Sequence, residues 1–245
     1  MKYAYSTDVG KRRTNNEDAV FANNLDAEAN VYIVADGMGG HNAGEVASKN
    51  VIQIVSSILN EQEAITQELI IKAIESANKS IFEMSKENKE LSGMGTTVVV
   101  AVTAEKQFTI AHVGDSRAYL ITKAGIQVLT MDHSWVQELI NTGALTQSEA
   151  KDHPQKNVIT RAIGIDKDVK VDVLQGEWNE GEILLLCSDG LNTHVEDNEI
   201  YDIISQSSDI EIAVAELIDL ANNRGGSDNI TVVLVENNLN GGINV

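Results

Sequence analysis

The amino-acid sequence predicts an α+β fold built from layers of mainly antiparallel sheet. Short runs rich in Val, Ile, Thr and Tyr, which favour pleated surfaces, recur along the whole chain. Segments with helical periodicity fall between these runs in blocks rather than after every strand, which argues against strict βαβ alternation. A Rossmann-like parallel sheet is the second choice.

Each predicted strand is a short apolar run. The runs are residues 2–7, 19–22, 31–35, 96–103, 107–113, 118–122, 126–129, 183–187 and 230–235. Residues 111–113 and 118–120 are close enough in sequence to pair as a hairpin. The predicted helices place apolar side chains on one stripe, and they are residues 44–60, 64–88 and 210–223, with shorter helices at 134–141 and 198–205.

The chain has 245 residues, of which 42% are hydrophobic, enough for a substantial core. We expect a single domain over residues 1–237 and a short frayed tail over 238–245. The segment 143–168 is polar and contains the only proline, Pro154, which is typical of a surface excursion rather than a core element.

The formal net charge of −19 should repel nucleic acid and anionic lipid. The densest basic cluster, Lys11-Arg12-Arg13, is too short for a nucleic-acid patch. A single cysteine, Cys187, allows no internal disulfide and suits a reducing compartment. The first residues show no apolar signal core, and no apolar run reaches the ~18–20 residues that span a bilayer. We therefore expect a cytoplasmic protein.

Aspartates stand at the ends of several apolar runs. They are Asp18, Asp36, Asp115, Asp189 and Asp228. Any one of them is most simply a turn residue, because Asp and Gly favour turns. Together they suggest carboxylates that converge at one edge of a sheet, where their repulsion would require a cation. An all-oxygen ligand set favours Mg²⁺ or Mn²⁺ over Zn²⁺. Both the turn and the metal interpretation remain open at this point.

Several short motifs occur in a fixed order. They are Thr7-Asp-Val-Gly10 with Arg13, Asn15-Asn-Glu-Asp18, Asp36-Gly-Met-Gly-Gly-His41, Gly93-Met-Gly-Thr-Thr97, Val113-Gly-Asp-Ser-Arg117, Ser188-Asp-Gly-Leu191 and Ser227-Asp-Asn229. In these residues the sequence resembles the metal-dependent protein Ser/Thr phosphatases of the PP2C-like, or PPM, family. The similarity is greatest to compact bacterial members that oppose eukaryote-like Ser/Thr kinases.

The resemblance implies a four-layer sandwich, in which two antiparallel sheets pack face to face with helix pairs outside. It implies hydrolysis of phosphoserine and phosphothreonine in proteins by a metal-activated water. The cofactors would be Mn²⁺ or Mg²⁺, as two core ions and a third. The partners would be phosphorylated proteins, including a Ser/Thr kinase and its substrates. We expect a monomer with no membrane insertion, and residues 143–168 would form a flap beside the active site.

The resemblance also assigns roles to individual residues. Asp36 would bridge two ions, with the Gly37 carbonyl as a further ligand. The other metal ligands would be Asp18, Asp189 and Asp228, and Asp115 would hold a third ion together with Asp189. Glu17 and Asn229 would support these ligands, and Arg13 would bind the substrate phosphate.

One position departs from the family pattern. Many eukaryotic members have a histidine in place of Met38 as the general acid, and Met38 cannot donate a proton. His41 in the same loop is the candidate replacement; the alternative is that it packs against the following helix. His112 and His133 are expected to be structural. A catalytically weak regulator that binds a phosphorylated partner is a second function, and a phosphatase dedicated to one phosphoserine protein is a third.

Overall fold

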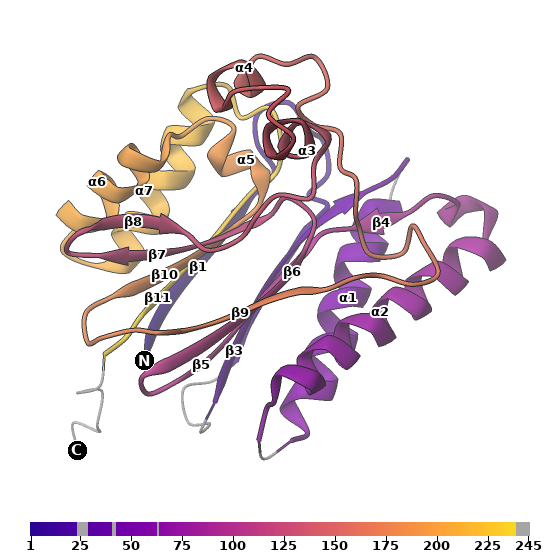
Figure 1. Ribbon diagram of the computed structural model, residues 1–245, viewed down its shortest axis with the longest axis horizontal. Helices are drawn as coiled ribbons and strands as arrows, with labels where there is room; N and C mark the ends of the chain where they lie inside the picture. The colour runs from indigo at the N-terminus through magenta and orange to yellow at the C-terminus, as the bar shows by residue number, and fades with distance from the viewer. Residues whose placement is uncertain (24–28, 41–42, 63, 239–245) are drawn as a thin grey trace.

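The computed structural model describes residues 1–23, 29–40, 43–62 and 64–238. Its strands form two sheets that lie face to face, with helices on both outer faces (Figure 1). Every strand pair among these residues is antiparallel. The predicted α+β sandwich is therefore confirmed, and the Rossmann-like alternative is wrong.

The first sheet has five strands in the order β1-β11-β10-β7-β8. Their bounds are β1 Lys2–Asp8, β11 Ile230–Glu236, β10 Ile183–Cys187, β7 Arg117–Thr122 and β8 Gly125–Val128. The apolar stripes of three helices pack on its outer face. These helices are α5 Asp189–Asn192, α6 Asp197–Gln206 and α7 Ile210–Asn223.

The second sheet follows the order β2-β3-β5-β6-β9, and β4 pairs with the end of β3. The bounds are β2 Asp18–Ala22, β3 Asn30–Met38, β4 Gly95–Thr96, β5 Val98–Ala104, β6 Gln107–Val113 and β9 Asp172–Glu177. Helices α1 (Ala43–Asn60) and α2 (Gln67–Glu87) cover its outer face, and a short 3₁₀ helix, η1 (Lys89–Leu91), follows α2.

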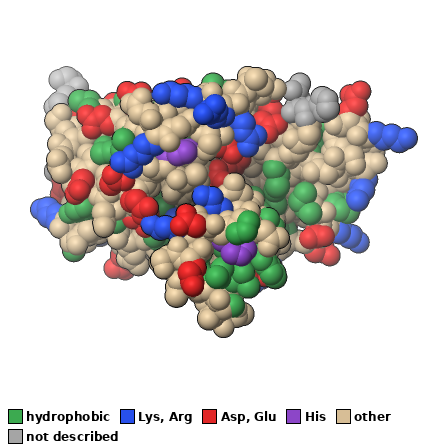
Figure 2. Space-filling model, turned by 90° about the horizontal axis from the view of Figure 1, so that it is seen from above, with side chains coloured by type: hydrophobic (Ala, Val, Ile, Leu, Met, Phe, Trp, Pro, Cys, Tyr) green, Lys and Arg blue, Asp and Glu red, His purple; other side chains and the backbone are tan. Residues whose placement is uncertain are grey.

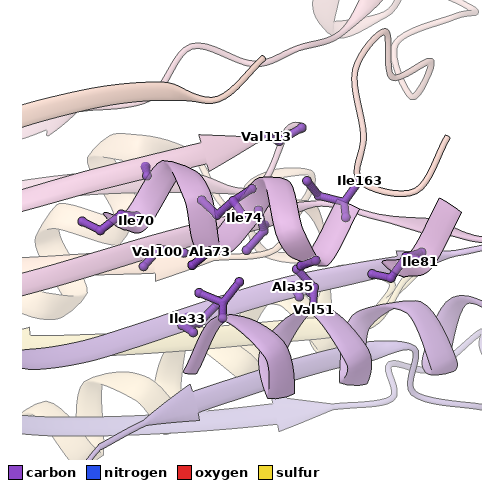
Figure 3. Close-up of a cluster of buried hydrophobic side chains, with 14 of the residues drawn as sticks. Ile33, Ala35, Val51, Ile70, Ala73, Ile74, Ile81, Val100, Val113 and Ile163 are labelled. Carbon is purple, nitrogen blue, oxygen red and sulfur yellow. The ribbon is translucent and has the colours of Figure 1, made fainter. Parts of the chain in front are cut away.

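Strand β3 shows why the central strands are almost continuously apolar. Tyr32 and Val34 point into the core between the two sheets, whereas Ile33 and Ala35 point into the core beneath α1 and α2 (Figure 3). All four side chains are fully buried. Because both faces of the strand are covered, the sequence shows no alternation of polar and apolar residues.

Some local predictions were wrong. The predicted hairpin of residues 111–113 with 118–120 does not form, because β6 pairs with β5 and β9 while β7 pairs with β10 and β8 in the other sheet. The predicted strand 96–103 is interrupted at Thr97, whose backbone N–H donates to the Asp36 carbonyl at 2.8 Å. Strand β9 was missed because this edge strand is half exposed and polar.

Between β8 and β9 the chain leaves the sheets and forms α3 (Trp135–Asn141) and α4 (Gln147–Lys151). A narrow neck closes this excursion: the Trp135 N–H donates to the Val158 carbonyl and the Thr160 N–H to the His133 carbonyl, both at 2.8 Å. The prediction that residues 143–168 form a surface excursion was wrong for its last part, because Ile163 bridges to Thr96 and is fully buried in the core beneath α1 and α2. Residues 239–245 of the predicted tail lie outside the described residues. Among the residues described, no helix is long and apolar enough to cross a membrane.

The core beneath α1 and α2 should contribute strongly to stability. We expect Ile33→Ala to lower the free energy of unfolding by about 2–5 kcal/mol, because it leaves a cavity in a fully buried site. Urea unfolding would measure the loss. Ile212→Ala is the matched control, since Ile212 on α7 is 47% exposed and should lose far less. Equal losses in the two variants would contradict the packing described here.

Candidate metal centre

Two of the predicted acids face each other across neighbouring strands. The register of β2 with β3 sets Asp18 directly opposite Asp36, so both side chains lie on the same face. The Asp36 N–H donates to Thr97 Oγ1 at 2.9 Å, and the Asp36 carbonyl accepts from Thr96 Oγ1 at 2.8 Å. These bonds fix the backbone at the point where β3 leaves the sheet.

Asp18 also connects the two sheets. Its Oδ2 accepts hydrogen bonds from Ser188 Oγ at 2.7 Å and from Thr231 Oγ1 at 2.6 Å. Ser188 follows β10 and Thr231 lies in β11, so both donors come from the opposite sheet. The other oxygen of Asp18, Oδ1, is buried without a hydrogen-bond partner.

Asp189 and Asp228 come from that opposite sheet. Asp189 begins α5 directly after β10, and Asp228 precedes β11. A Cβ atom on Gly190 would lie 2.0 Å from the Asn229 carbonyl oxygen, so the glycine allows these two loops to meet. The Asp36 carboxyl group lies close enough to Asp189 to influence its pKa. The sandwich thus brings acids from both sheets to one edge.

Asp115 lies in the turn that passes from β6 in one sheet to β7 in the other. Its carboxyl group is buried, and Oδ1 has no hydrogen-bond partner. Arg117 forms a bidentate ion pair with Asp132, with N···O distances of 2.8 and 2.7 Å. This pair links the Asp115 turn to the start of the flap. The sequence motif includes Arg117, but no pattern in the sequence indicated its pairing with Asp132.

The acids strongly perturb one another. Burial, opposed by the Thr231 and Ser188 hydrogen bonds, raises the pKa of Asp18 to about 7. Burial and the charge of Asp189 raise the pKa of Asp115 to about 8. Burial and Asp228 raise the pKa of Asp189 to about 6, and burial with the neighbouring carboxylates raises the pKa of Asp36 well above its usual range. This is the electrostatic pattern of a site that is incomplete without positive charge.

The donor atoms fit a hard divalent cation. Asp18, Asp115 and Asp189 each present a buried Oδ1 atom that no protein group satisfies. Buried polar atoms without partners are uncommon, and each one requires an explanation. Carboxylate oxygens are the ligands that Mg²⁺ and Mn²⁺ prefer. The residues present therefore fit the predicted ions.

The supporting residues predicted at the site lie around this edge. The Gly37 N–H donates to the Glu17 carbonyl at 3.2 Å, and a Cβ atom on Gly37 would lie 2.2 Å from the Gly44 carbonyl oxygen. Asn229 Oδ1 accepts from the Glu17 N–H at 2.8 Å, and Asn229 Nδ2 donates to the Val9 carbonyl at 2.9 Å. Burial raises the pKa of Glu17. Asn229 thus positions the loop that carries Glu17 and Asp18.

Arg13 reaches the same edge from the first loop. Its side chain is about half exposed, and its NH2 group donates to Asp228 Oδ2 at 2.7 Å. A guanidinium with this freedom is suited to binding an incoming oxyanion. His41 lies outside the described residues.

A second polar cluster was expected only to be structural. The metal-ligating atoms of His112, His133 and Asp172 lie within 4.8 Å of one another, and His112 Nδ1 has no hydrogen-bond partner. However, the Gly114 N–H donates to His133 Nδ1 at 3.0 Å, which leaves the proton on Nε2. That Nε2–H donates to Asp172 Oδ2 at 3.2 Å, and Arg161 NH1 already pairs with Asp172 Oδ1 at 3.0 Å. These contacts indicate that the cluster connects the flap neck to the sheet rather than binding a metal ion.

Comparisons with known proteins agree with this geometry. A family profile described as protein phosphatase 2C matches residues 9–232. The serine/threonine phosphatase stp of Listeria welshimeri is 41% identical over 98% of this chain and 97% of its own length. The structure of the S. agalactiae serine/threonine phosphatase superposes with a TM-score of 0.90 at 37% identity, covering 95% of this chain and 98% of that one. The catalytic domain of PstP in complex with two manganese ions gives a TM-score of 0.86 at 34% identity, covering 96% and 97%.

The raised carboxyl pKa values predict a pH-dependent stability. In a chelator, the folded chain retains protons on Asp18 and Asp115 that the unfolded chain releases above about pH 4, so stability should fall as the pH rises from about 4 to about 8. Saturating Mn²⁺ should reverse this loss, since it binds the folded state. Thermal unfolding with and without chelator would measure both effects.

Asp18→Asn should reduce both the pH slope in chelator and the gain from Mn²⁺. Asp202→Asn, which changes an exposed carboxyl group on α6, is the matched control and should alter neither. A slope that Asp18→Asn leaves unchanged would contradict the assignment.

Proposed function

The chain belongs to the protein phosphatase 2C family, and on that premise we propose that it hydrolyses phosphoserine and phosphothreonine in proteins with the help of divalent metal ions. The observation that carries the proposal is the set of unsatisfied carboxylate oxygens where the two sheets meet. Such a set needs cations, and divalent cations are what metal-assisted phosphate-ester hydrolysis requires.

The proposed ligands are the acids of this edge. Asp18, Asp36, Asp189 and Asp228 would hold two ions together with the Gly37 carbonyl, and Asp115 with Asp189 would hold a third. Mn²⁺ or Mg²⁺ fits the all-oxygen set. When bound, such ions lower the pKa of a water and neutralise phosphate charge. Glu17 and Asn229 support the ligands through the contacts described above.

The protein's own contribution begins with the substrate phosphate. Arg13 exchanges its contact with Asp228 for phosphate oxygens, which its planar guanidinium can bind in pairs. Water attacks phosphorus in line with the departing serine or threonine oxygen, the P–O bond to the side chain breaks, and a proton returns to the leaving oxygen. His41 is the proposed proton donor, because Met38 carries no acidic proton.

The biological setting follows from the same premise. We infer that the substrates are phosphorylated proteins and that a Ser/Thr kinase supplies them. Residues 1–237 would act as one catalytic domain, in the cytoplasm and as a monomer, with the flap beside the site. Removal of the acidic set would leave a phosphoprotein-binding module, but no contact among the described residues favours that second function.

Asp36 offers the sharpest test of the mechanism. Asp36→Asn should lower turnover of a phosphothreonine peptide in Mn²⁺ by ~10³-fold or more, equivalent to ~4 kcal/mol of transition-state stabilisation. Calorimetric titration should show weakened Mn²⁺ binding. Asp219→Asn, at an exposed position of α7, is the control and should retain full activity. Turnover by the wild-type enzyme that persists in a chelator would contradict the metal mechanism.

Arg13 should affect substrate binding more than turnover. Arg13→Ala should raise KM for the phosphopeptide by roughly tenfold or more, because a charged hydrogen-bond donor to phosphate is lost, with a smaller change in kcat. Arg13→Lys should restore part of the loss. An unchanged KM in Arg13→Ala, with Mn²⁺ affinity intact, would remove Arg13 from the phosphate site.

A further inference from the structure

A group of basic side chains borders the candidate metal centre of this strongly acidic protein. Lys11 and Arg12 are exposed, and so is Lys156 in the flap. Many Lys and Arg side chains of the described residues are engaged in ion pairs with carboxylates. None of these three takes part in such a pair; Lys11 Nζ only approaches the neutral Asn223 Oδ1 at 3.4 Å.

The backbone fixes Lys11 and Arg12 beside the metal-site loop. Their N–H groups both donate to the Gly226 carbonyl, at 2.8 and 3.1 Å, two residues before Asp228. A Cβ atom on Gly10 would lie 2.2 Å from the Asp228 carbonyl oxygen, so the two loops are in close contact. The backbone that carries these two basic side chains is therefore held in contact with the loop of Asp228, a candidate metal ligand.

Lys156 approaches the same loop from the flap. The flap is anchored here by Lys151, whose Nζ contacts Glu196 at 2.6 and 2.8 Å. Two residues before Glu196, His194 Nε2 accepts from the Ser227 N–H at 3.1 Å. Burial and the nearby charges of Lys156 and Arg224 lower the pKa of His194, which agrees with this placement. Lys156 thus lies near His194, which contacts the loop that also holds the backbone of Lys11 and Arg12.

Figure 2 looks down on the end of the molecule that carries the flap. Several Lys and Arg side chains lie around one histidine there, with Asp and Glu side chains beside them. Against a net charge of −19, a local concentration of unpaired positive charge beside a phosphate site favours an anionic ligand.

We propose that Lys11, Arg12 and Lys156 form a basic rim that binds anionic groups of the substrate polypeptide, on residues that flank the phosphorylated serine or threonine. This proposal rests on the proposed phosphatase function and specifies its substrate class. The anionic group is a carboxylate or a second phosphate, since both offer oxygens to Lys and Arg. The rim selects segments whose charge the rest of the protein surface would repel.

The test compares phosphothreonine peptides of one sequence with glutamine flanks, glutamate flanks, or a second phosphothreonine. In wild-type enzyme with Mn²⁺, kcat/KM for either anionic peptide should exceed that for the glutamine peptide by about three- to tenfold. The preference should decrease as ionic strength rises, since exposed charges are screened beyond ~8 Å at physiological salt. The anionic peptide with the higher kcat/KM shows whether the rim prefers a carboxylate or a second phosphate.

The double variant Arg12→Ala, Lys156→Ala should reduce the ratio of anionic to neutral kcat/KM to near unity. The matched control is Lys72→Ala, Lys79→Ala, which removes the same charge from the exposed face of α2 and should keep the wild-type ratio. A wild-type enzyme that hydrolyses all peptides equally overturns the rim while leaving the phosphatase function intact. A preference that survives the double variant, or that salt does not change, also overturns it.

Discussion

Asp18 and Asp36 face each other across adjacent strands, and three further aspartates approach them from other elements, so like charges meet at a site where Asp18 and Asp115 are buried. Their repulsion opposes folding in the absence of cations, and the structure counters it locally. Ser188 and Thr231 donate to one Asp18 oxygen, which stabilises a carboxylate that burial would otherwise neutralise. The Oδ1 atoms of Asp18, Asp115 and Asp189 have no such donors, and this deficit is what a metal ion would supply.

The sandwich makes this arrangement possible because its two sheets share an apolar core. Both faces of β3 are buried, so the strand cannot shift its register without exposing large apolar side chains or moving Asp36 out of line with Asp18. The hydrophobic core therefore holds the acids together against their repulsion. Glycines at 37 and 190 remove the Cβ atoms that would keep the neighbouring backbones apart.

The aspartates at the ends of the apolar runs suggested that carboxylates converge at one edge of a sheet, and the structure brings them together there; their roles as metal ligands stay a prediction. The sequence could not predict which sheet β7 would join, since the Gly114–Arg117 turn permits a hairpin as readily as a crossing between sheets. The polar edge strand β9 lacked any periodic signal. The Arg117–Asp132 ion pair and the cluster around His133 join residues far apart in the chain, so no local pattern revealed them. His41 remains an untested prediction.

The flap neck allows the tip of the flap to change in evolution without changing the sheets that carry the acids. Hydrogen bonds between the segments at 133–135 and 158–160 bring the ends of the excursion together before α3 begins. Loop closure at that point makes the length and composition of the intervening residues nearly independent of the sheets. In descendants of this chain, the tip between residues 136 and 157 can therefore be replaced, be shortened or change its charge without moving the acids. Diversity in what is recognised can accumulate there while the chemistry stays the same.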